Sequence, residues 1–168
     1  MSVKLDFSTL DLMDALDLAI LIEDEARDRY SFFAEQIGRR DVVDAASVFE
    51  SMAINEDKHG RQLADRRQEL FGDKPMRVNK TAIFDVEAPE FGAPRWNMSP
   101  LKAFQLALVS EEKAYGFYDE AIKHVKDPGV HQLFTELRDE ETEHVRLVMD
   151  AIATLPPGSD VDVEDQDD

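Results

Sequence analysis

Residues 134–148 read FTELRDEETEHVRLV, and the spacing within this stretch decides the fold. Positions seven, four and three residues before Glu141, and three and seven residues after it, share one face of a helix. That face carries Phe134, Leu137, Arg138, His144 and Val148. A Glu-x-x-His step therefore stands on a helical stripe that is otherwise largely apolar.

Three other glutamates have the same kind of surroundings. At the same offsets, Glu56 has Phe49, Met52, Ala53, His59 and Leu63, which includes a second Glu-x-x-His step. Glu23 has Leu16, Ala19, Ile20, Ala26 and Tyr30, and Glu111 has Phe104, Ala107, Leu108, Ala114 and Tyr118. Because the sets match in pairs, a Glu-Ala-Tyr pattern followed by a Glu-His pattern occurs twice, which indicates an internal duplication.

Four carboxylates on core-facing stripes need positive charge among them. Burying an unpaired carboxylate costs several kcal/mol or neutralises the group by raising its pKa. Among the basic residues, only Arg27 and Arg138 come close to these stripes. A pair of divalent cations would supply the charge instead.

The spacing makes a dinuclear metal site the main functional prediction. Residues i and i+3 of a helix lie about 60° apart around the axis, so a Glu and a His at this spacing address one small volume. Packing the two halves face to face gathers the candidate ligands Glu23, Glu56, His59, Glu111, Glu141 and His144. Such a set suits two ions of iron or manganese, with each histidine capping one ion and carboxylates bridging, and zinc could substitute.

The same periodicity and its flanking signals predict four helices and an all-α fold. We expect helices over residues 9–37, with Ser8 or Thr9 as the N-cap, over 41–70, over 99–125, opened by Ser99-Pro100, and over 127–154, opened by Asp127-Pro128. Short connections make the first two helices one antiparallel hairpin and the last two another. The predicted architecture is a four-helix bundle of two antiparallel hairpins.

Domain organisation follows from what lies outside these helices. Residues 71–99 lack a sustained helical period and contain most of the prolines, which suits a long crossover along the bundle. Trp96 is interpreted either as an anchor of this crossover or as a residue at a subunit interface. We therefore predict one bundle domain over residues 1–155. Residues 156–168 are mostly acidic and are expected to form a disordered tail.

Composition excludes several classes of partner and site. A net charge of -18 would be repelled by nucleic acid and by anionic membranes, so neither is expected as a partner. The absence of cysteine excludes thiolate catalysis and cysteine-ligated metal centres. The sequence contains no apolar run of transmembrane length and no signal peptide, which favours the cytoplasm.

The repeated pattern resembles the ferritin-like superfamily and, within it, the rubrerythrin-like proteins, in which each hairpin contributes a Glu and a Glu-x-x-His. The resemblance covers residues 10–154. It implies that the six candidates above are metal ligands, with Glu56 and Glu141 as the bridging pair. It also implies a diiron centre that reacts with dioxygen or hydrogen peroxide, in a role connected with oxidative stress.

Two departures from rubrerythrins proper bear on the reaction. This chain has no cysteine for a rubredoxin domain, so we expect an external electron donor. Ala114 stands where rubrerythrins typically carry a second carboxylate one turn after the third-helix ligand. The remaining four-Glu, two-His set is similar to that of bacterioferritin-type ferroxidase centres. The leading hypothesis is a diiron peroxide or dioxygen reductase, the alternative is a ferroxidase for iron handling or storage, and a third is a diiron hydroxylase.

Other residues receive simpler interpretations. Tyr30 and Tyr118 are predicted to fill the core beside the metals with their hydroxyls bonded to ligand carboxylates, and a radical or electron-relay role is the alternative for them. The predicted catalytic residues are these two tyrosines with Glu23, Glu56, Glu111 and Glu141. Apolar helix surface left after bundle packing favours a homodimer. Charged or polar neighbours of the ligands are expected to be solvated, namely Asp57, Glu140 and Glu143, with His124 and His131 at the surface. Met52 and Met149 are interpreted as core side chains rather than ligands.

Overall fold

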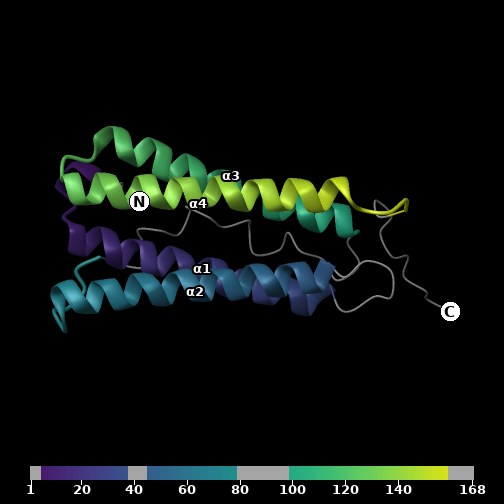
Figure 1. The fold of residues 1–168 in the computed structure, drawn as a ribbon, viewed down its shortest axis with the longest axis horizontal. Coiled ribbons are helices and arrows are strands. Elements are labelled where there is room, and N and C mark those ends of the chain that lie inside the picture. The colour runs from purple at the N-terminus through teal and green to yellow at the C-terminus, as the bar shows by residue number, and fades with distance from the viewer. Residues whose placement is uncertain (1–4, 38–44, 79–98, 159–168) are drawn as a thin grey trace.

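The computed structural model describes residues 5–37, 45–78 and 99–158. A short 3-10 helix, η1 (Phe7–Thr9), precedes four long helices, which are α1 (Leu12–Ile37), α2 (Ala45–Phe71), α3 (Pro100–His124) and α4 (Pro128–Ala153). Helices α1 and α2 lie side by side as one hairpin, and α3 and α4 as the other (Figure 1). No strand occurs in these described ranges. The prediction of an all-α four-helix bundle of two hairpins is confirmed.

The two hairpins are arranged as a long crossover requires. Helix α2 ends and α3 begins at opposite ends of the bundle (Figure 1). Most of the predicted crossover, residues 79–98 with Trp96, lies outside the described residues, as does most of the predicted acidic tail, residues 159–168. The proposed domain limits therefore stay predictions.

The helix starts follow the predicted capping signals in the second hairpin. The side chain of Ser99 accepts a hydrogen bond from the Lys102 N–H, and that of Asp127 accepts from Gly129 and Val130, each directly before a proline. The prediction of Ser8 or Thr9 as the cap of the first helix is wrong. Asp11 accepts from the Asp14 N–H there, because residues 7–9 form η1.

The core consists of two apolar clusters along the bundle with a layer of glutamates between them. One cluster includes Ile22, Leu63 and Tyr118, and the other includes Ala26 and Phe104. Along α1, Glu23 falls between Ile22 of the first cluster and Ala26 of the second. A buried polar layer enclosed by apolar packing on both sides is kept dry and rigid, and such a layer positions ligands well.

An ion pair with little solvent exposure ties the first hairpin together away from this layer. Arg67 of α2 donates to both carboxylate oxygens of Asp17 in α1, at 2.8 and 3.3 Å. It also donates to the carbonyl oxygens of Gly72 and Lys74, so it secures the end of α2. The prediction that Met149 is a core side chain is wrong, because Met149 is 55% exposed. Met52 is buried as expected.

Candidate metal centre

The six predicted ligands come together where the two hairpins face each other. Helix α1 contributes Glu23, α2 contributes Glu56 and His59, α3 contributes Glu111, and α4 contributes Glu141 and His144. Each of the four glutamates is at most 2% exposed, and His144 is 7% exposed. His59 is half-buried. Their role as metal ligands stays a prediction, but their convergence is a property of the fold.

His144 lies at the centre of the more deeply buried group. Its Nδ1 lies 3.2 Å from a carboxylate oxygen of Glu56, 3.3 Å from one of Glu111 and 3.5 Å from one of Glu141. Ligand atoms of Glu56, Glu111 and His144 all lie within 4.8 Å of one another. This group joins three helices and both hairpins, so it could hold a cation between them.

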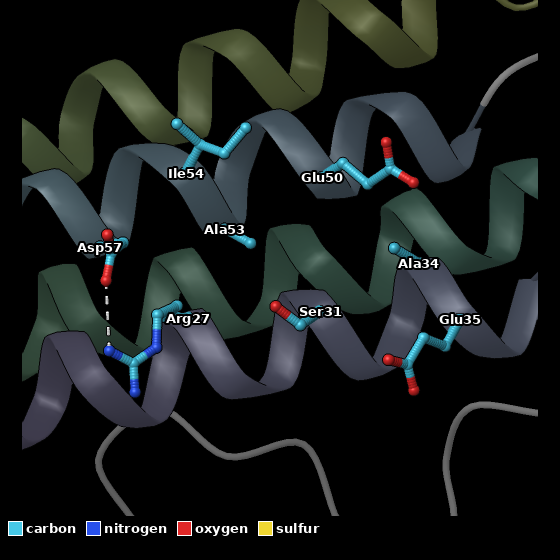
Figure 2. A pocket seen from close by; sticks show the side chains of 8 residues that line it. All are labelled: Arg27, Ser31, Ala34, Glu35, Glu50, Ala53, Ile54 and Asp57. Atoms are coloured by element: carbon cyan, nitrogen blue, oxygen red, sulfur yellow. Dashed lines mark hydrogen bonds and ion pairs between the residues drawn. The ribbon is translucent and has the colours of Figure 1, made fainter.

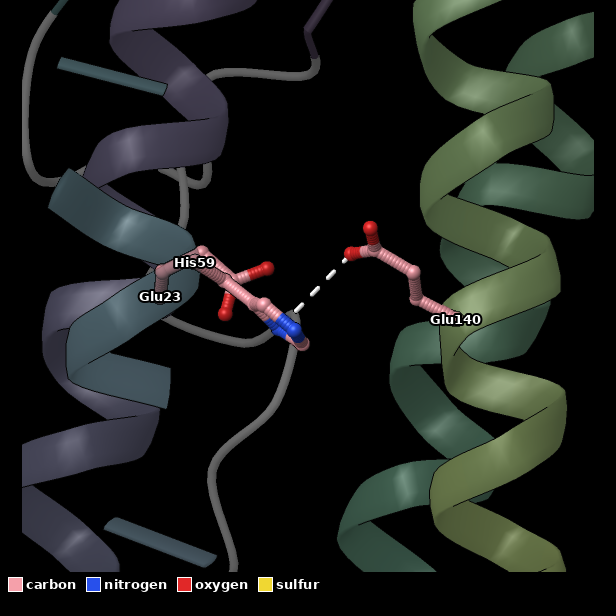
Figure 3. A group of neighbouring side chains, drawn as sticks. All are labelled: Glu23, His59 and Glu140. Atoms are coloured by element: carbon pink, nitrogen blue, oxygen red, sulfur yellow. Dashed lines mark ion pairs between the residues drawn. The ribbon is translucent and has the colours of Figure 1, made fainter. Parts of the chain in front are cut away.

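A second group lies beside the first on the side of His59. It consists of Glu23, His59 and Glu140, whose ligand atoms also lie within 4.8 Å of one another. Figure 3 shows Glu23 and His59 on the first hairpin, with the carboxylate of Glu140 reaching toward them from α4. The imidazole rings of the two groups, His59 and His144, stack with centroids 5.6 Å apart. Each of the two adjacent groups could hold a metal ion.

Several buried polar atoms in this layer are left without hydrogen bonds. Glu23 Oε2, Glu111 Oε1, Glu141 Oε2 and His59 Nδ1 make none within the described parts of the chain. Burying such groups unsatisfied costs about 1–3 kcal/mol each, and more when they are charged. Oxygen and imidazole nitrogen atoms are the ligands that iron and manganese accept, so the donor set fits two such ions.

The two arginines nearest the stripes, Arg27 and Arg138, pair with aspartates rather than with these glutamates. The hydrogen-bonded ion pairs of Arg27 are with Asp24, Asp28 and Asp57, and that of Arg138 is with Asp119. Both arginines lie near the stripes, as the sequence indicates, yet both are engaged by aspartates. Neither arginine brings its positive charge to the site, where protons or metal ions could supply it instead.

Without metal, bound protons reduce the negative charge of the buried glutamates, as their pKa values show. Burial, followed by the hydrogen bond and charge of Glu56, raises the pKa of Glu23 well above its ordinary value. Burial also raises the pKa of Glu141 to about 8, and the negative charge of Glu111 adds to the effect. Metal binding at neutral pH must displace these protons.

The two histidines differ strongly in basicity. Burial alone would lower the pKa of His144, but its contacts with Glu111 and Glu141 and the charge of Glu56 outweigh this and raise the pKa to about 12. Burial, together with the positive charges of His144 and Lys58, lowers the pKa of His59. His144 is therefore the cation of the metal-free site, and His59 is a neutral imidazole ready to bind metal.

Gly60 allows α1 to approach α2 closely at the site. A Cβ atom at Gly60 would lie 3.3 Å from Asp24 Oδ1 and 3.6 Å from Glu23 Cβ. A contact at 3.3 Å is tight, so a side chain at position 60 would require the Asp24 carboxylate to shift by a few tenths of an ångström. The glycine directly after His59 thus leaves room for the Asp24 side chain beside α2.

The two tyrosines are buried on opposite sides of the glutamate layer. Tyr30 belongs to one apolar cluster and stacks on Phe49, with ring centroids 6.1 Å apart. Tyr118 belongs to the other and packs against Phe117 and Phe134. The Tyr30 hydroxyl makes no hydrogen bond to any described residue, so the predicted bond to a ligand carboxylate is not formed there.

The interpretation of Glu140 as a solvated surface charge is incomplete. Its side chain is 42% exposed, yet its Oε2 lies 3.7 Å from His59 Nδ1. Spacing around Glu141 could not show this, because Glu140 points about 100° away from Glu141 on the helix. The duplication offered one signal, because the two halves differ at this position: Glu140 in the second half corresponds to Asn55 in the first.

The other polar neighbours lie at the surface. His124 and His131 are exposed as expected, and Asp57 and Glu143 form ion pairs with arginines.

Two cavities differ in their relation to the site. One of about 520 Å³ lies between α1 and α2, where Arg27 bridges to Asp57 (Figure 2), and none of the six predicted ligands lines it. A smaller cavity of about 150 Å³ lies between α2 and α4 and is lined by His59, Arg66, Glu136 and Glu140, among others. The smaller cavity adjoins the site.

Among the described residues, no helix is both long and apolar enough to cross a membrane.

Comparisons with known proteins agree with this architecture. The family model described as Rubrerythrin matches residues 14–152, and a second match covers residues 102–166. The crystal structure of an uncharacterized conserved protein from Magnetospirillum magnetotacticum MS-1 is similar, with 28% identity and a TM-score of 0.73, over 88% of this chain and 97% of that one. A search of curated proteins gives no significant match.

Proposed function

The chain belongs to the rubrerythrin family, and we propose that it is a nonhaem diiron oxidoreductase that reduces hydrogen peroxide or dioxygen with electrons from an external donor. One observation carries the proposal. Four buried glutamates and two histidines converge between the hairpins, and three of the carboxylates keep an oxygen atom without a hydrogen bond within the described residues. Structural ion pairing accounts for Glu141 Oε2, which lies 3.5 Å from His144 Nδ1, but it does not account for Glu23 Oε2 or Glu111 Oε1.

The ligand roles follow from the positions of the side chains. Glu56 and Glu141 are the proposed bridging carboxylates, and both face His144 from different hairpins. Glu23 with His59 and Glu111 with His144 are the proposed terminal ligands, one pair for each ion. Two ferrous ions, when bound, supply two electrons, which with two protons convert one hydrogen peroxide molecule into two waters or one dioxygen into hydrogen peroxide.

The protein supplies geometry, a dry enclosure and limited access. Apolar clusters on both sides of the glutamate layer keep bulk water from the ligands. The adjoining cavity of about 150 Å³ is smaller than the roughly 300 Å³ at which sites for drug-sized ligands begin. A small oxidant therefore fits this opening better than the organic substrate that a hydroxylase would require.

Anaerobic titration with ferrous iron, followed by rapid mixing with dioxygen and with hydrogen peroxide in parallel, tests the proposal. We expect two ferrous ions per chain and a diferric ultraviolet absorption after oxidation. Glu56→Ala should lose that absorption, whereas Glu143→Ala, at an exposed carboxylate paired with Arg146, should keep it. A two-iron spectrum that is unchanged in Glu56→Ala would reject the ligand assignment.

An iron-handling ferroxidase is the second candidate, and Ala114 favours it. This residue is fully buried one turn after Glu111, so α3 brings no second carboxylate to the site at that position. Native mass and iron content after aerobic loading separate the two functions. A closed multi-chain assembly that retains many irons per chain would establish storage, and a small oligomer with about two irons per chain would exclude it.

A homodimer is part of the proposal and has support from the surface. Large apolar side chains remain exposed on the helices, including Phe32, Ile54, Val109, Leu147 and Met149. The same native mass measurement gives the oligomeric state. We also propose a cytoplasmic location, which fractionation of cells that express the protein would test.

A further inference from the structure

We propose that Glu140 is a seventh metal ligand, which binds a divalent cation together with Glu23 and His59 at the mouth of the cavity between α2 and α4. The inference rests on the proposed function, because it adds a ligand to that same centre. It goes beyond the six-ligand set that the duplication implies, and it makes the two metal positions different from each other.

The spacing of the three side chains fits a cation. Atoms bound to one ion at about 2.1 Å lie ~3.0 Å apart when their bonds are perpendicular and ~4.2 Å apart when they are opposite. Glu140 Oε2 lies 3.7 Å from His59 Nδ1, too far for a hydrogen bond and within this range. All three ligand atoms lie within 4.8 Å of one another, so small side-chain movements bring them around one ion.

Unsatisfied buried atoms point to a missing partner at this position. Glu23 is 2% exposed, and its Oε2 makes no hydrogen bond within the described residues. His59 Nδ1 is also buried and lacks a hydrogen bond there. Figure 3 shows the side chains of Glu23 and His59 directed toward the carboxylate of Glu140. A cation at this point would coordinate Glu23 Oε2 and His59 Nδ1, which otherwise lack a hydrogen bond within the described residues.

Glu140 connects the site with solvent more directly than the six predicted ligands do, of which five are buried and His59 is half-buried. Its side chain is 42% exposed, and it lines the cavity together with His59 and Glu136. Glu136 is one turn earlier on the same helix, but it pairs with Arg66 at 3.6 Å. Glu140 is therefore the cavity carboxylate that is directed at the site, and an incoming cation meets it first.

The duplicated half-site has no counterpart to this ligand. In the first half, Asn55 occupies the position before the Glu-x-x-His step that Glu140 occupies in the second half, and it is exposed. The group around His144 is formed by Glu56 and Glu111, and all three of its members are buried. The cation near His59 thus has an extra, solvent-facing carboxylate, and the cation near His144 does not.

Anaerobic titration of the full chain with Co²⁺, followed by calorimetry and by visible absorption, tests the proposal. The wild type should bind two ions per chain. Glu140→Gln should weaken one of the two by about tenfold or more and change the absorption of that ion. Glu136→Gln removes the same charge from the same cavity and should change either affinity by less than about threefold, since it acts only through screened charge. Far-ultraviolet circular dichroism checks that both variants are folded.

The outcomes separate this inference from the proposed function. If Glu140→Gln binds both ions as Glu136→Gln does, while the wild type binds two ions and oxidises ferrous iron, only the inference about Glu140 is overturned. If the wild type binds no divalent metal, the proposed function and the inference both fail. Glu140→Asp keeps the charge but shortens the side chain. It should weaken binding of the same ion as Glu140→Gln does, because the shorter side chain no longer reaches a cation bound to His59.

Discussion

The imidazole rings of His59 and His144 lie nearly parallel, with planes inclined by 6° and centroids 5.6 Å apart, although they come from different hairpins. The duplication makes the two residues equivalent in sequence. Their environments are not equivalent. His144 Nδ1 faces three carboxylates within 3.5 Å, whereas in the described part of the chain His59 pairs with one carboxylate within 4.0 Å, that of Glu140. The two imidazoles therefore differ in how strongly they affect stability and metal binding.

In the metal-free protein, removing the His144 imidazole should lower the free energy of unfolding much more than removing the His59 imidazole. His144→Ala leaves Glu56, Glu111 and Glu141 without their cation and should cost roughly 3–5 kcal/mol, as breaking a buried ion pair does. His59→Ala removes a half-buried ring without a hydrogen bond at Nδ1 and should cost about 1 kcal/mol or less. Urea denaturation of the chelator-treated variants measures both values. Equal losses would contradict the contacts described for His144.

The metal-free protein should lose stability as pH rises above about 5. The folded pKa of Glu141 is about 8 against an ordinary 4.5, so its native state binds a proton more tightly than the unfolded state. The resulting stabilisation is complete below pH 4.5 and disappears as pH rises to 8. The pKa of Glu23 shifts in the same direction, and the contribution of His144, whose pKa is raised to about 12, declines from pH 6.5 upward and is lost at about pH 12.

Thermal melts at pH 5, 6.5 and 8 in the presence of a chelator measure this slope. Glu141→Gln, which cannot ionise, should show a shallower dependence than the wild type. Melting temperatures of the wild type that rise steadily over this range would contradict the pKa directions.

Metal binding near neutral pH should release protons. At pH 7 the site holds protons on His144 and on the buried carboxyls whose pKa values are raised, and the bound cations must replace them. Apparent affinity should therefore increase with pH between 6 and 8. Titration calorimetry with Co²⁺ in two buffers of different ionisation enthalpy gives the number of protons released. Identical heats in both buffers would show that the site is already deprotonated.

Tyr30→Phe should leave stability unchanged or raise it by up to about 1 kcal/mol. The Tyr30 hydroxyl is buried and makes no hydrogen bond within the described residues, so its loss removes a desolvated polar group without breaking a contact. Phe49→Ala, at the ring on which Tyr30 stacks, should instead cost roughly 3–5 kcal/mol. Slower iron oxidation in a stable Tyr30→Phe variant would support the electron-relay role.

The periodicity of single helices was sufficient to predict much of the site. Glu23, Glu56, Glu111 and Glu141 are buried because the positions three, four and seven residues away are apolar, and this pattern is visible without any tertiary contact. The starts at Ser99-Pro100 and Asp127-Pro128 were predictable for the same reason, since caps act within one turn. The failure at Ser8 and Thr9 arose where a second local signal, Asp6, formed η1 instead.

By itself, the sequence determined the four helices, their core-facing stripes and the six residues that converge between the hairpins, because these depend on spacing along single helices. Only the tertiary structure decided that Glu140 reaches His59, that His144 is the cation of the metal-free site, and that Met149 is exposed. The physical reason is that the spacing within one helix does not specify which neighbouring helix lies against each of its faces, at what distance, or what charges that helix carries.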